Sequence, residues 1–368
     1  MKHAVHALAV MRLLVFVTGR LAAFDPGDWM RDLREVIGQF PLTRVAIPGS
    51  HNSGSHAATW KSARSDDSEL HPVLHKVVPF VVADWARCQR NSILLQLLNG
   101  IRYLDVRLQY APGGKSSLCH SVCCMPLADF NRELREFVDG HASEIVIVHS
   151  HRGIFGLSDN RDEAAAQQNE VVPAVVDGIG RERVANRLFT AGSLVNAFMD
   201  AGVNVVMVFP DESVSRRHNI WDESQSLTRH WPASENVRDV LNFAKELWRK
   251  RDNFSKLHVA ELILSPKDTS IVAAAAAGLA TGVPLGIVGS SLCKGLADYY
   301  VPQTIMGFCR QLTESVPDFL HHCWVTSSDD IFENINIIMI DDCDMQSGAI
   351  IKRIVQVNLD KIPLTNGP

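Results

Sequence analysis

The segment QLLNGIRYLDVRL, residues 96–108, says most about the fold of this chain. Its second half, 101–108, is an apolar run that predicts a strand, with Asp105 and Arg107 near its carboxyl end. Because side chains alternate between the two faces of a strand, these two residues are expected on the same face. Apolar residues on both faces are typical of a parallel strand that is covered by helices.

Five further apolar runs resemble this one, and helical patterns lie between them. The runs are residues 43–47, 144–148, 204–209, 258–264 and 335–340. Pro126 precedes apolar residues at one-face helical spacing, and Val237 begins a second such pattern. No repeat or Pro/Ser-rich linker divides the chain. We therefore predict a single α/β domain over 24–368.

Ionisable residues follow the ends of the predicted strands. They are His51, Asp105, Arg107, His149, His151, Asp211 and Asp341. Any one of them alone would be an ordinary loop residue. In a parallel barrel, however, the carboxyl ends of all strands lie on one face, where barrel enzymes hold their active sites. The pattern as a whole therefore predicts that these groups converge on one site.

Composition excludes several classes of protein. The 368 residues are 46% hydrophobic and 21% charged, which excludes a disordered chain. With 36 basic and 41 acidic residues and no dense basic tract, nucleic acid is not an expected partner. Eight cysteines are too few for a disulfide scaffold. The spacing of Cys119, His120, Cys123 and Cys124 does not fit a zinc knuckle, so buried thiols are expected there.

Two apolar segments bear on location. Residues 1–23 combine Lys2 with an apolar run that Arg12 interrupts, so a signal peptide and a cytoplasmic N-terminal extension both remain open. Residues 271–292 approach membrane length but contain Pro284 and several glycines, which favours a buried helix and loop over a transmembrane span. The sequence leaves the compartment, cytoplasmic or secreted, undecided.

Residues 47–54, IPGSHNSG, form the most specific motif. A tight Pro48-Gly49 turn after a strand presents His51 at the barrel mouth, beside small residues that leave room for a ligand. On the neighbouring strand, Arg107 beside Asp105 fits either an anion clamp or a structural ion pair.

These two motifs, followed in order by LCHS (118–121), EIVIV (144–148) and IMID (338–341), resemble the X-domain of phosphatidylinositol-specific phospholipase C. The resemblance runs from about residue 29 to residue 357 and implies a single distorted TIM barrel of the phospholipase C-like phosphodiesterase type. It also implies cleavage of phosphatidylinositol to diacylglycerol and a cyclic inositol phosphate, which water then opens.

The resemblance assigns a role to each of five residues. His51 is the general base and His120 the general acid, since imidazoles titrate near neutral pH. Asp341 orients His51, and Arg107 neutralises the charge on the phosphorane. Asp105 holds either Arg107 or the attacking hydroxyl.

The resemblance favours a site without calcium or another cofactor. Calcium-dependent relatives carry an acidic ligand at the position of Arg107, where metal-independent ones carry Arg. Asn52 matches a calcium ligand, but His151 stands where a further acidic ligand is expected, and calcium requires several oxygen ligands. For His149 and His151 we expect hydrogen bonding rather than metal binding.

Substrate and membrane contacts are less well determined. The bacterial enzymes' Lys and Arg for the inositol headgroup are absent near His151 and Pro210, so Asn52, His151, Asp211 and Trp231, with Arg152, are the candidate replacements. The apolar loop 73–82 fits either an exposed rim that contacts a membrane or a packing segment. We expect a monomer that contacts phosphatidylinositol membranes peripherally.

Two other functions remain open. His151-Arg152-Gly153 resembles the opening of glycerophosphodiester phosphodiesterases, but the Glu-Asn pair expected next is missing. A catalytically weak or inactive barrel that binds inositol lipids or a protein partner would have no need of an acid–base pair. The phospholipase function therefore fits these residues best.

Overall fold

The computed structural model describes residues 25–267, 304–326 and 331–361 of the chain. The predictions for residues 1–23 and for the apolar segment 271–292 concern residues outside these ranges. Within them, no helix is both long and apolar enough to cross a membrane.

Eight parallel strands form a nearly closed barrel in the order β7-β6-β5-β2-β1-β10-β9-β8. Their bounds are β1 Ile47–Ser50, β2 Tyr103–Gln109, β5 Val146–Phe155, β6 Val205–Phe209, β7 Trp221–Asp222, β8 Leu227–His230, β9 Leu257–Leu262 and β10 Ile337–Ile340. Five of the six predicted strands form near their predicted positions, and the predicted barrel is confirmed. The prediction for 43–47 is wrong: Leu42–Arg44 form a 3₁₀ turn and β1 begins only at Ile47, so Pro48 and Gly49 lie within the strand and not in a turn after it. The sequence pattern missed β7 and β8, which lie at the two ends of this order and are linked by the short helix α11 (Glu223–Ser226).

A hairpin of β3 (Ser117–His120) and β4 (Val122–Pro126) extends β2 beyond the barrel. Both of its pairings are antiparallel, and Ser121 makes the turn with a left-handed φ of 58°. The hairpin thereby brings His120, at the end of β3, back toward the carboxyl end of the barrel.

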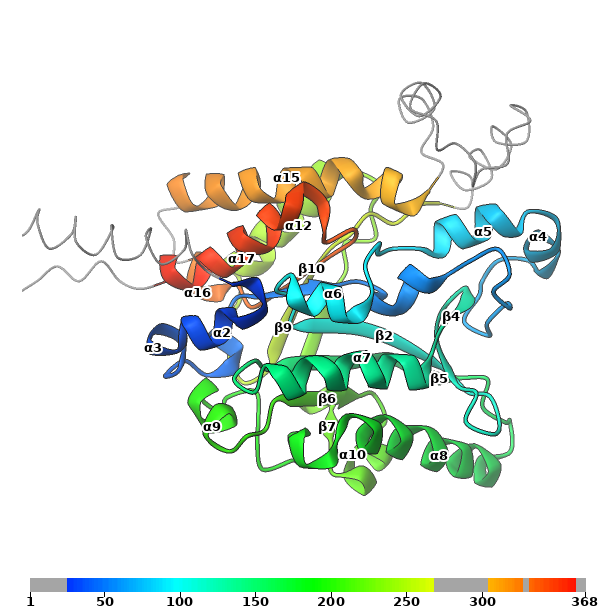
Figure 1. The fold of residues 1–368 in the computed structure, drawn as a ribbon. Coiled ribbons are helices and arrows are strands. Elements are labelled where there is room, and N and C mark those ends of the chain that lie inside the picture. The colour runs from blue at the N-terminus through cyan, green and yellow to red at the C-terminus, as the bar shows by residue number, and fades with distance from the viewer. Residues whose placement is uncertain (1–24, 268–303, 327–330, 362–368) are drawn as a thin grey trace, which may run out of the picture.

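Helices surround the barrel on several sides (Figure 1). The predicted helical patterns form α7 (Leu127–Gly140) and α12 (Val237–Arg249), and both turn apolar faces inward. The others are α2 Trp29–Asp32, α3 Arg34–Ile37, α4 Pro72–Val77, α5 Pro79–Ala86, α6 Ile93–Leu98, α8 Arg161–Ile179, α9 Val195–Asp200, α10 Glu212–His218, α15 Ile305–Thr326, α16 Ile331–Asn334 and α17 Ala349–Asp360.

The two ends of the barrel differ. At the amino end, Arg102 and Glu144 form a fully buried ion pair of 2.7 Å, and Arg102 also donates to the backbone carbonyl of Gly27. This end is therefore sealed by satisfied polar contacts. In Figure 1, α4 and α5 lie at the end opposite to α2 and α3.

The segment predicted as an apolar loop over 73–82 forms α4 and most of α5 instead. Val81 and Val82 are buried, whereas Val73 and Val77 are 53% and 67% exposed. Both expectations for this segment hold in part, because one face packs on the barrel and the other faces solvent.

Candidate active site

A cavity of about 670 Å³ opens at the carboxyl end of the barrel. Several predicted residues line it together, namely His51, Arg107, His120, His151, Arg152, Trp231 and Asp341. Asp67, Cys88, Glu223, Arg229 and Glu261 also line it, and sequence reasoning did not single these out. The strand ends therefore converge on one site, as their polar residues predicted.

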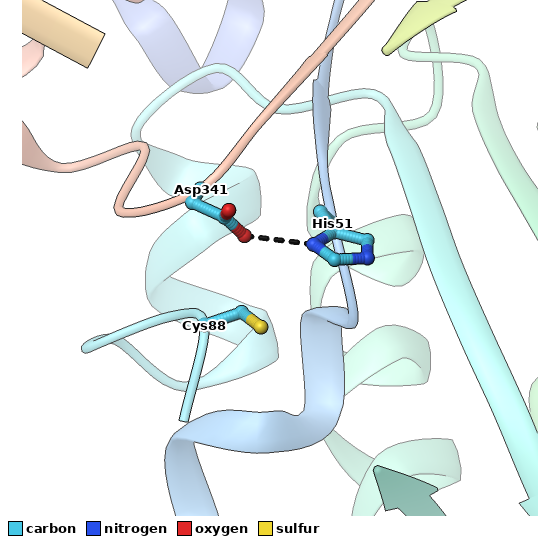
Figure 2. Close-up of side chains that lie close together, drawn as sticks. All are labelled: His51, Cys88 and Asp341. Atoms are coloured by element: carbon cyan, nitrogen blue, oxygen red, sulfur yellow. Dashed lines mark hydrogen bonds and ion pairs between the residues drawn. The ribbon is translucent and has the colours of Figure 1, made fainter. Parts of the chain in front are cut away.

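His51 is held on both ring nitrogens, and Figure 2 shows the contact with Asp341. Its Nδ1 lies 2.8 Å from Oδ1 of Asp341, and the side-chain amide of Asn52 lies 2.8 Å from its Nε2. The carboxylate accepts a hydrogen bond from the Nδ1–H group, so Nε2 carries the lone pair and accepts a hydrogen bond from the amide. Asp341 is fully buried, and its other oxygen accepts from the thiol of Cys309 at 3.1 Å. This arrangement leaves Nε2 as the basic atom.

Cys88 lies beside this pair but is not set up as a nucleophile (Figure 2). Burial, and next the negative charge of Asp341, raise the pKa of the Cys88 thiol well above its usual range. A thiol needs to be deprotonated to attack, so Cys88 stays inert at neutral pH.

His120 faces His51 across the cavity, with 6.0 Å between the ring centroids. Its Nδ1 donates to the backbone carbonyl of Ala86 at 2.7 Å, which leaves Nε2 free. Burial, and next the positive charge of Arg107, lower the pKa of His120 to about 4. In the empty cavity this imidazole is therefore neutral at pH 7.

Arg107 has a different partner from the one predicted. The sequence suggested that Asp105 holds it, but Arg107 donates to Oδ2 of Asp67 at 3.1 Å. The backbone N–H of Ser121 fixes the other oxygen of Asp67 at 3.0 Å. Nε of Arg107 is buried and has no hydrogen-bond partner in the part of the chain that the structure describes. The guanidinium of Arg107 as a whole lines the cavity.

Asp105 serves a separate ion-pair network inside the barrel. Its two oxygens accept from Arg229 and from the backbone N–H of Asn52, both at 3.0 Å, and Arg229 also donates to Glu261 at 2.7 Å. Burial, the largest single influence, raises the pKa of Asp105, but the nearby charges of Arg229, His51, His151 and Arg107 together outweigh it, and the pKa lies well below its usual range. Arg229 is on the short strand β8, so sequence periodicity could not reveal this partner. Glu261, a lone acid within an apolar run, was the available signal.

His149 and His151, both on β5, lie on another side of the site; His151 lines the cavity, and His149 is fully buried. Nδ1 of His149 lies 2.7 Å from the hydroxyl of Tyr103, and its Nε2 lies 3.1 Å from Oε2 of Glu223. Burial, and next the positive charge of Arg229, lower the pKa of His151 to about 2. Both residues point into the barrel, since they alternate along one strand.

Two of the four residues predicted to bind substrate do not line the cavity. Asp211 caps α10 by accepting from the backbone N–H groups of Ser213 and Val214. Asn52 is buried and contacts His51, so it acts on the base rather than on a ligand. Trp231 does line the cavity, is 53% exposed, and donates to Ser265 at 2.7 Å.

Cys119, Cys123 and Cys124 are free thiols; Cys119 is buried as expected, but Cys123 and Cys124 are only half-buried. Within the described residues, the clusters with the spacing of a metal site are His51, Cys88 and Asp341, and His149, His151 and Glu223. Neither includes a cysteine of the hairpin.

Comparisons with known proteins find related sequences. Residues 69–153 match the family model of the PI-PLC X 1 domain. The variant-surface-glycoprotein phospholipase C of Trypanosoma cruzi is 25% identical over 68% of this chain and 69% of its own length. The PI-PLC X domain-containing protein 1 of Mus musculus is 36% identical over 34% of this chain and 39% of its own length.

Solved structures support the same fold. Phosphatidylinositol-specific phospholipase C from Staphylococcus aureus superposes with a TM-score of 0.58 at 13% identity, covering 91% of this chain and 98% of that one. The enzyme from Listeria monocytogenes gives 0.54 at 12% identity, covering 91% and 99%. At such identity the likeness concerns the barrel alone. Residues 69–153 thus match the PI-PLC X domain, the chain resembles PI-PLC X domain-containing proteins in sequence, and its barrel has the fold of the bacterial phosphatidylinositol-specific phospholipases C.

Proposed function

We propose that this protein cleaves the phosphodiester of phosphatidylinositol by acid–base catalysis. The observation that carries the proposal is the pair of imidazoles, His51 and His120, which face each other over one cavity beside Arg107. Two groups that titrate near neutrality on opposite sides of a phosphodiester can take a proton from the nucleophile and give one to the leaving group.

In the first step, Nε2 of His51 removes the proton of the inositol 2-hydroxyl, whose oxygen attacks phosphorus. Nε2 accepts a hydrogen bond from the side-chain amide of Asn52, so the substrate hydroxyl has to replace that amide. Asp341 stabilises the imidazolium that forms, because its buried carboxylate lies 2.8 Å from Nδ1.

His120 gives a proton to the glycerol oxygen as the phosphorus–oxygen bond breaks, which releases diacylglycerol and leaves a cyclic inositol phosphate. Since the pKa of free His120 is about 4, an anionic phosphodiester has to raise that pKa before His120 can act as the acid. Water then opens the ring, with the two histidines exchanging roles.

Arg107 lines the cavity, and its guanidinium supplies positive charge to stabilise the phosphorane oxygens. Calcium does not fit the same position. Both oxygens of Asp105 are already engaged, by Arg229 and by Asn52, and the guanidinium of Arg107 brings a positive charge. A calcium ion needs six to eight oxygen ligands, so we propose a reaction that does not require calcium.

An exposed apolar surface on α4, α5 and the preceding loop supports contact with a bilayer. Val73, Val77 and Phe80 are exposed there, and Phe80 packs on the exposed Trp60 with 5.2 Å between ring centroids. The net charge of −5 provides no attraction to anionic lipids, so apolar insertion has to supply the binding energy.

The membrane contact has a direct test. We expect Val77→Glu to weaken binding to phosphatidylinositol vesicles about tenfold while leaving hydrolysis of a soluble short-chain substrate unchanged. Leu188→Glu is the matched control. Leu188 is 89% exposed, and it lies shortly after Val184, which bridges to Val205 at the start of β6 and therefore at the amino end of the barrel, away from the proposed membrane contact. Equal loss in both variants would contradict a specific docking surface.

The proposed reaction is tested by incubating the purified protein with phosphatidylinositol vesicles in the presence of chelator and following the cyclic and open inositol phosphates. We expect both products. If the native protein forms neither product under any metal condition, the alternative of a barrel that only binds inositol lipids takes its place.

A further inference from the structure

A second set of ionisable side chains lies inside the barrel, apart from the acid–base pair. His149 and His151 come from β5, and Glu223 begins α11, the helix that joins β7 to β8. One donor atom from each of the three lies within 4.8 Å of the other two. The cleavage proposed above has no task for this cluster.

The contact between His149 and Glu223 is short without being a hydrogen bond. Nε2 of His149 is buried, and no hydrogen bond of acceptable geometry reaches it, although Oε2 of Glu223 lies 3.1 Å away. Two ligands of one tetrahedral zinc ion, each bound at 2.0–2.1 Å, lie about 3.3 Å apart. The spacing therefore suits a shared ion better than an in-line N–H···O bond.

The outer nitrogen of His149 is already held. Its Nδ1 lies 2.7 Å from the hydroxyl of the fully buried Tyr103. Histidines that bind metals usually have their second nitrogen fixed in this way, which orients the ring and selects the tautomer.

His151 completes the set with a nitrogen that nothing else uses. Its Nδ1 is buried and lacks a hydrogen-bond partner among the residues that the structure describes. The hydrogen-bonding role expected from the sequence accounts for Nδ1 of His149 but not for His151.

We propose that His149, His151 and Glu223 bind one Zn²⁺ ion, with a fourth position open to the cavity. Two imidazoles and one carboxylate are a set that zinc accepts, whereas calcium prefers oxygen ligands alone. The open position would take water or an oxygen of a bound anion, because His151 and Glu223 both line the cavity. The acid–base step does not pass through this ion, and zinc binding stands whether or not the phosphodiester is cleaved.

The test is zinc binding to the metal-stripped full chain by equilibrium dialysis. We expect one equivalent with a Kd of about 1 µM or tighter, and at least a hundredfold weaker binding in Glu223→Gln and in His151→Asn. Tyr103→Phe should weaken binding about tenfold, because it loosens His149 without removing a ligand. His258→Gln is the control, because His258 pairs with His230 outside both clusters and should bind zinc normally.

Cobalt substitution distinguishes this site from the cluster of His51, Cys88 and Asp341. Cobalt held by nitrogen and oxygen alone gives tetrahedral visible bands without a sulfur charge-transfer band, and Cys88→Ala should leave this spectrum unchanged. The proposal is overturned if no zinc binds near micromolar concentration. It is also overturned if Cys88→Ala abolishes binding while a folded Glu223→Gln retains it.

Discussion

The site contains two pairs of histidines, His51 with His120 and His149 with His151. The two pairs differ in the groups that contact their ring nitrogens. In the first pair, His51 is held by Asp341 and His120 by a backbone carbonyl, and neither ring contacts the carboxylate of Glu223. In the second pair, His149 lies between Tyr103 and Glu223.

The difference teaches that residue type alone does not assign a role to a histidine. A carboxylate on one nitrogen makes the other nitrogen a better base, as for His51. At His149, by contrast, the carboxylate of Glu223 lies beside Nε2, the nitrogen that would otherwise exchange protons with a substrate. The second pair is therefore suited to holding a ligand and the first to moving a proton.

The largest expected effect is the loss of kcat when the proposed acid, His120, is replaced. His120→Gln removes the acid and should lower kcat on phosphatidylinositol about 10³-fold, whereas His151→Asn should lower kcat no more than about tenfold. Initial rates of inositol phosphate release measure both, with circular dichroism to check folding. An equal loss in the two variants would mean that the two pairs of histidines do not divide the work in this way.

A second substitution probes the ion-pair network inside the barrel. Asp105→Asn leaves Arg229 with Glu261 as its remaining acidic partner, so the free energy of unfolding should fall by about 3 kcal/mol. Urea unfolding at pH 7 measures it. Glu212→Gln breaks an exposed pair with Arg216 and should cost less than about 0.5 kcal/mol. A loss of similar size in both variants would show that Asp105 has no special structural weight.

Asp67 links the loop after β1 to Arg107, and we expect it to position that residue. Asp67→Asn should lower kcat about 10- to 100-fold, because a freed guanidinium no longer meets the phosphorane in a fixed orientation. A double-mutant cycle separates this role from a merely structural one. In an Arg107→Ala background the same substitution should have little further effect, and additive losses would contradict the positioning role.

The sequence predicted the barrel because its long strands are continuous apolar runs, and their polarity predicted which side chains would meet. It predicted neither β7, which has two residues, nor β8, whose four residues include Arg229 and His230. Strands this short and polar carry no periodic signal, so the partner of Asp105 could not be inferred.

Two errors have local physical causes. Asp105 and Arg107 share a strand face, which suggested an ion pair. Arg107 instead donates to Asp67, which belongs to the loop after β1. Asp211 follows a strand end as predicted, yet a short aspartate directly before a helix satisfies backbone N–H groups instead of lining a cavity. Both outcomes depend on loop geometry, which apolar periodicity does not encode.

A third pair of histidines has neither of the two proposed functions, so it shows how burial affects the pKa of a histidine. His230 and His258 lie side by side on β8 and β9, with 5.1 Å between ring centroids, and neither lines the cavity. Burial lowers the pKa of His258 to about 4, helped by the charges of Arg251, His230 and Lys256, while Asp252 acts in the opposite direction.

The sign of the resulting pH dependence follows from proton uptake. The unfolded chain binds a proton at His258 near pH 6.5, whereas the folded chain does so only near pH 4, so stability is lost as the pH falls between these values. Because the ring is half-buried, we expect His258→Gln to reduce the loss between pH 7 and pH 5 by about 1 kcal/mol. Urea unfolding at the two pH values measures it, and kcat at pH 7 should not change. An unaltered pH dependence in the variant would mean that the His258 ring is solvated enough to titrate normally, and that burial at this position does not depress a histidine as it does on the cavity walls.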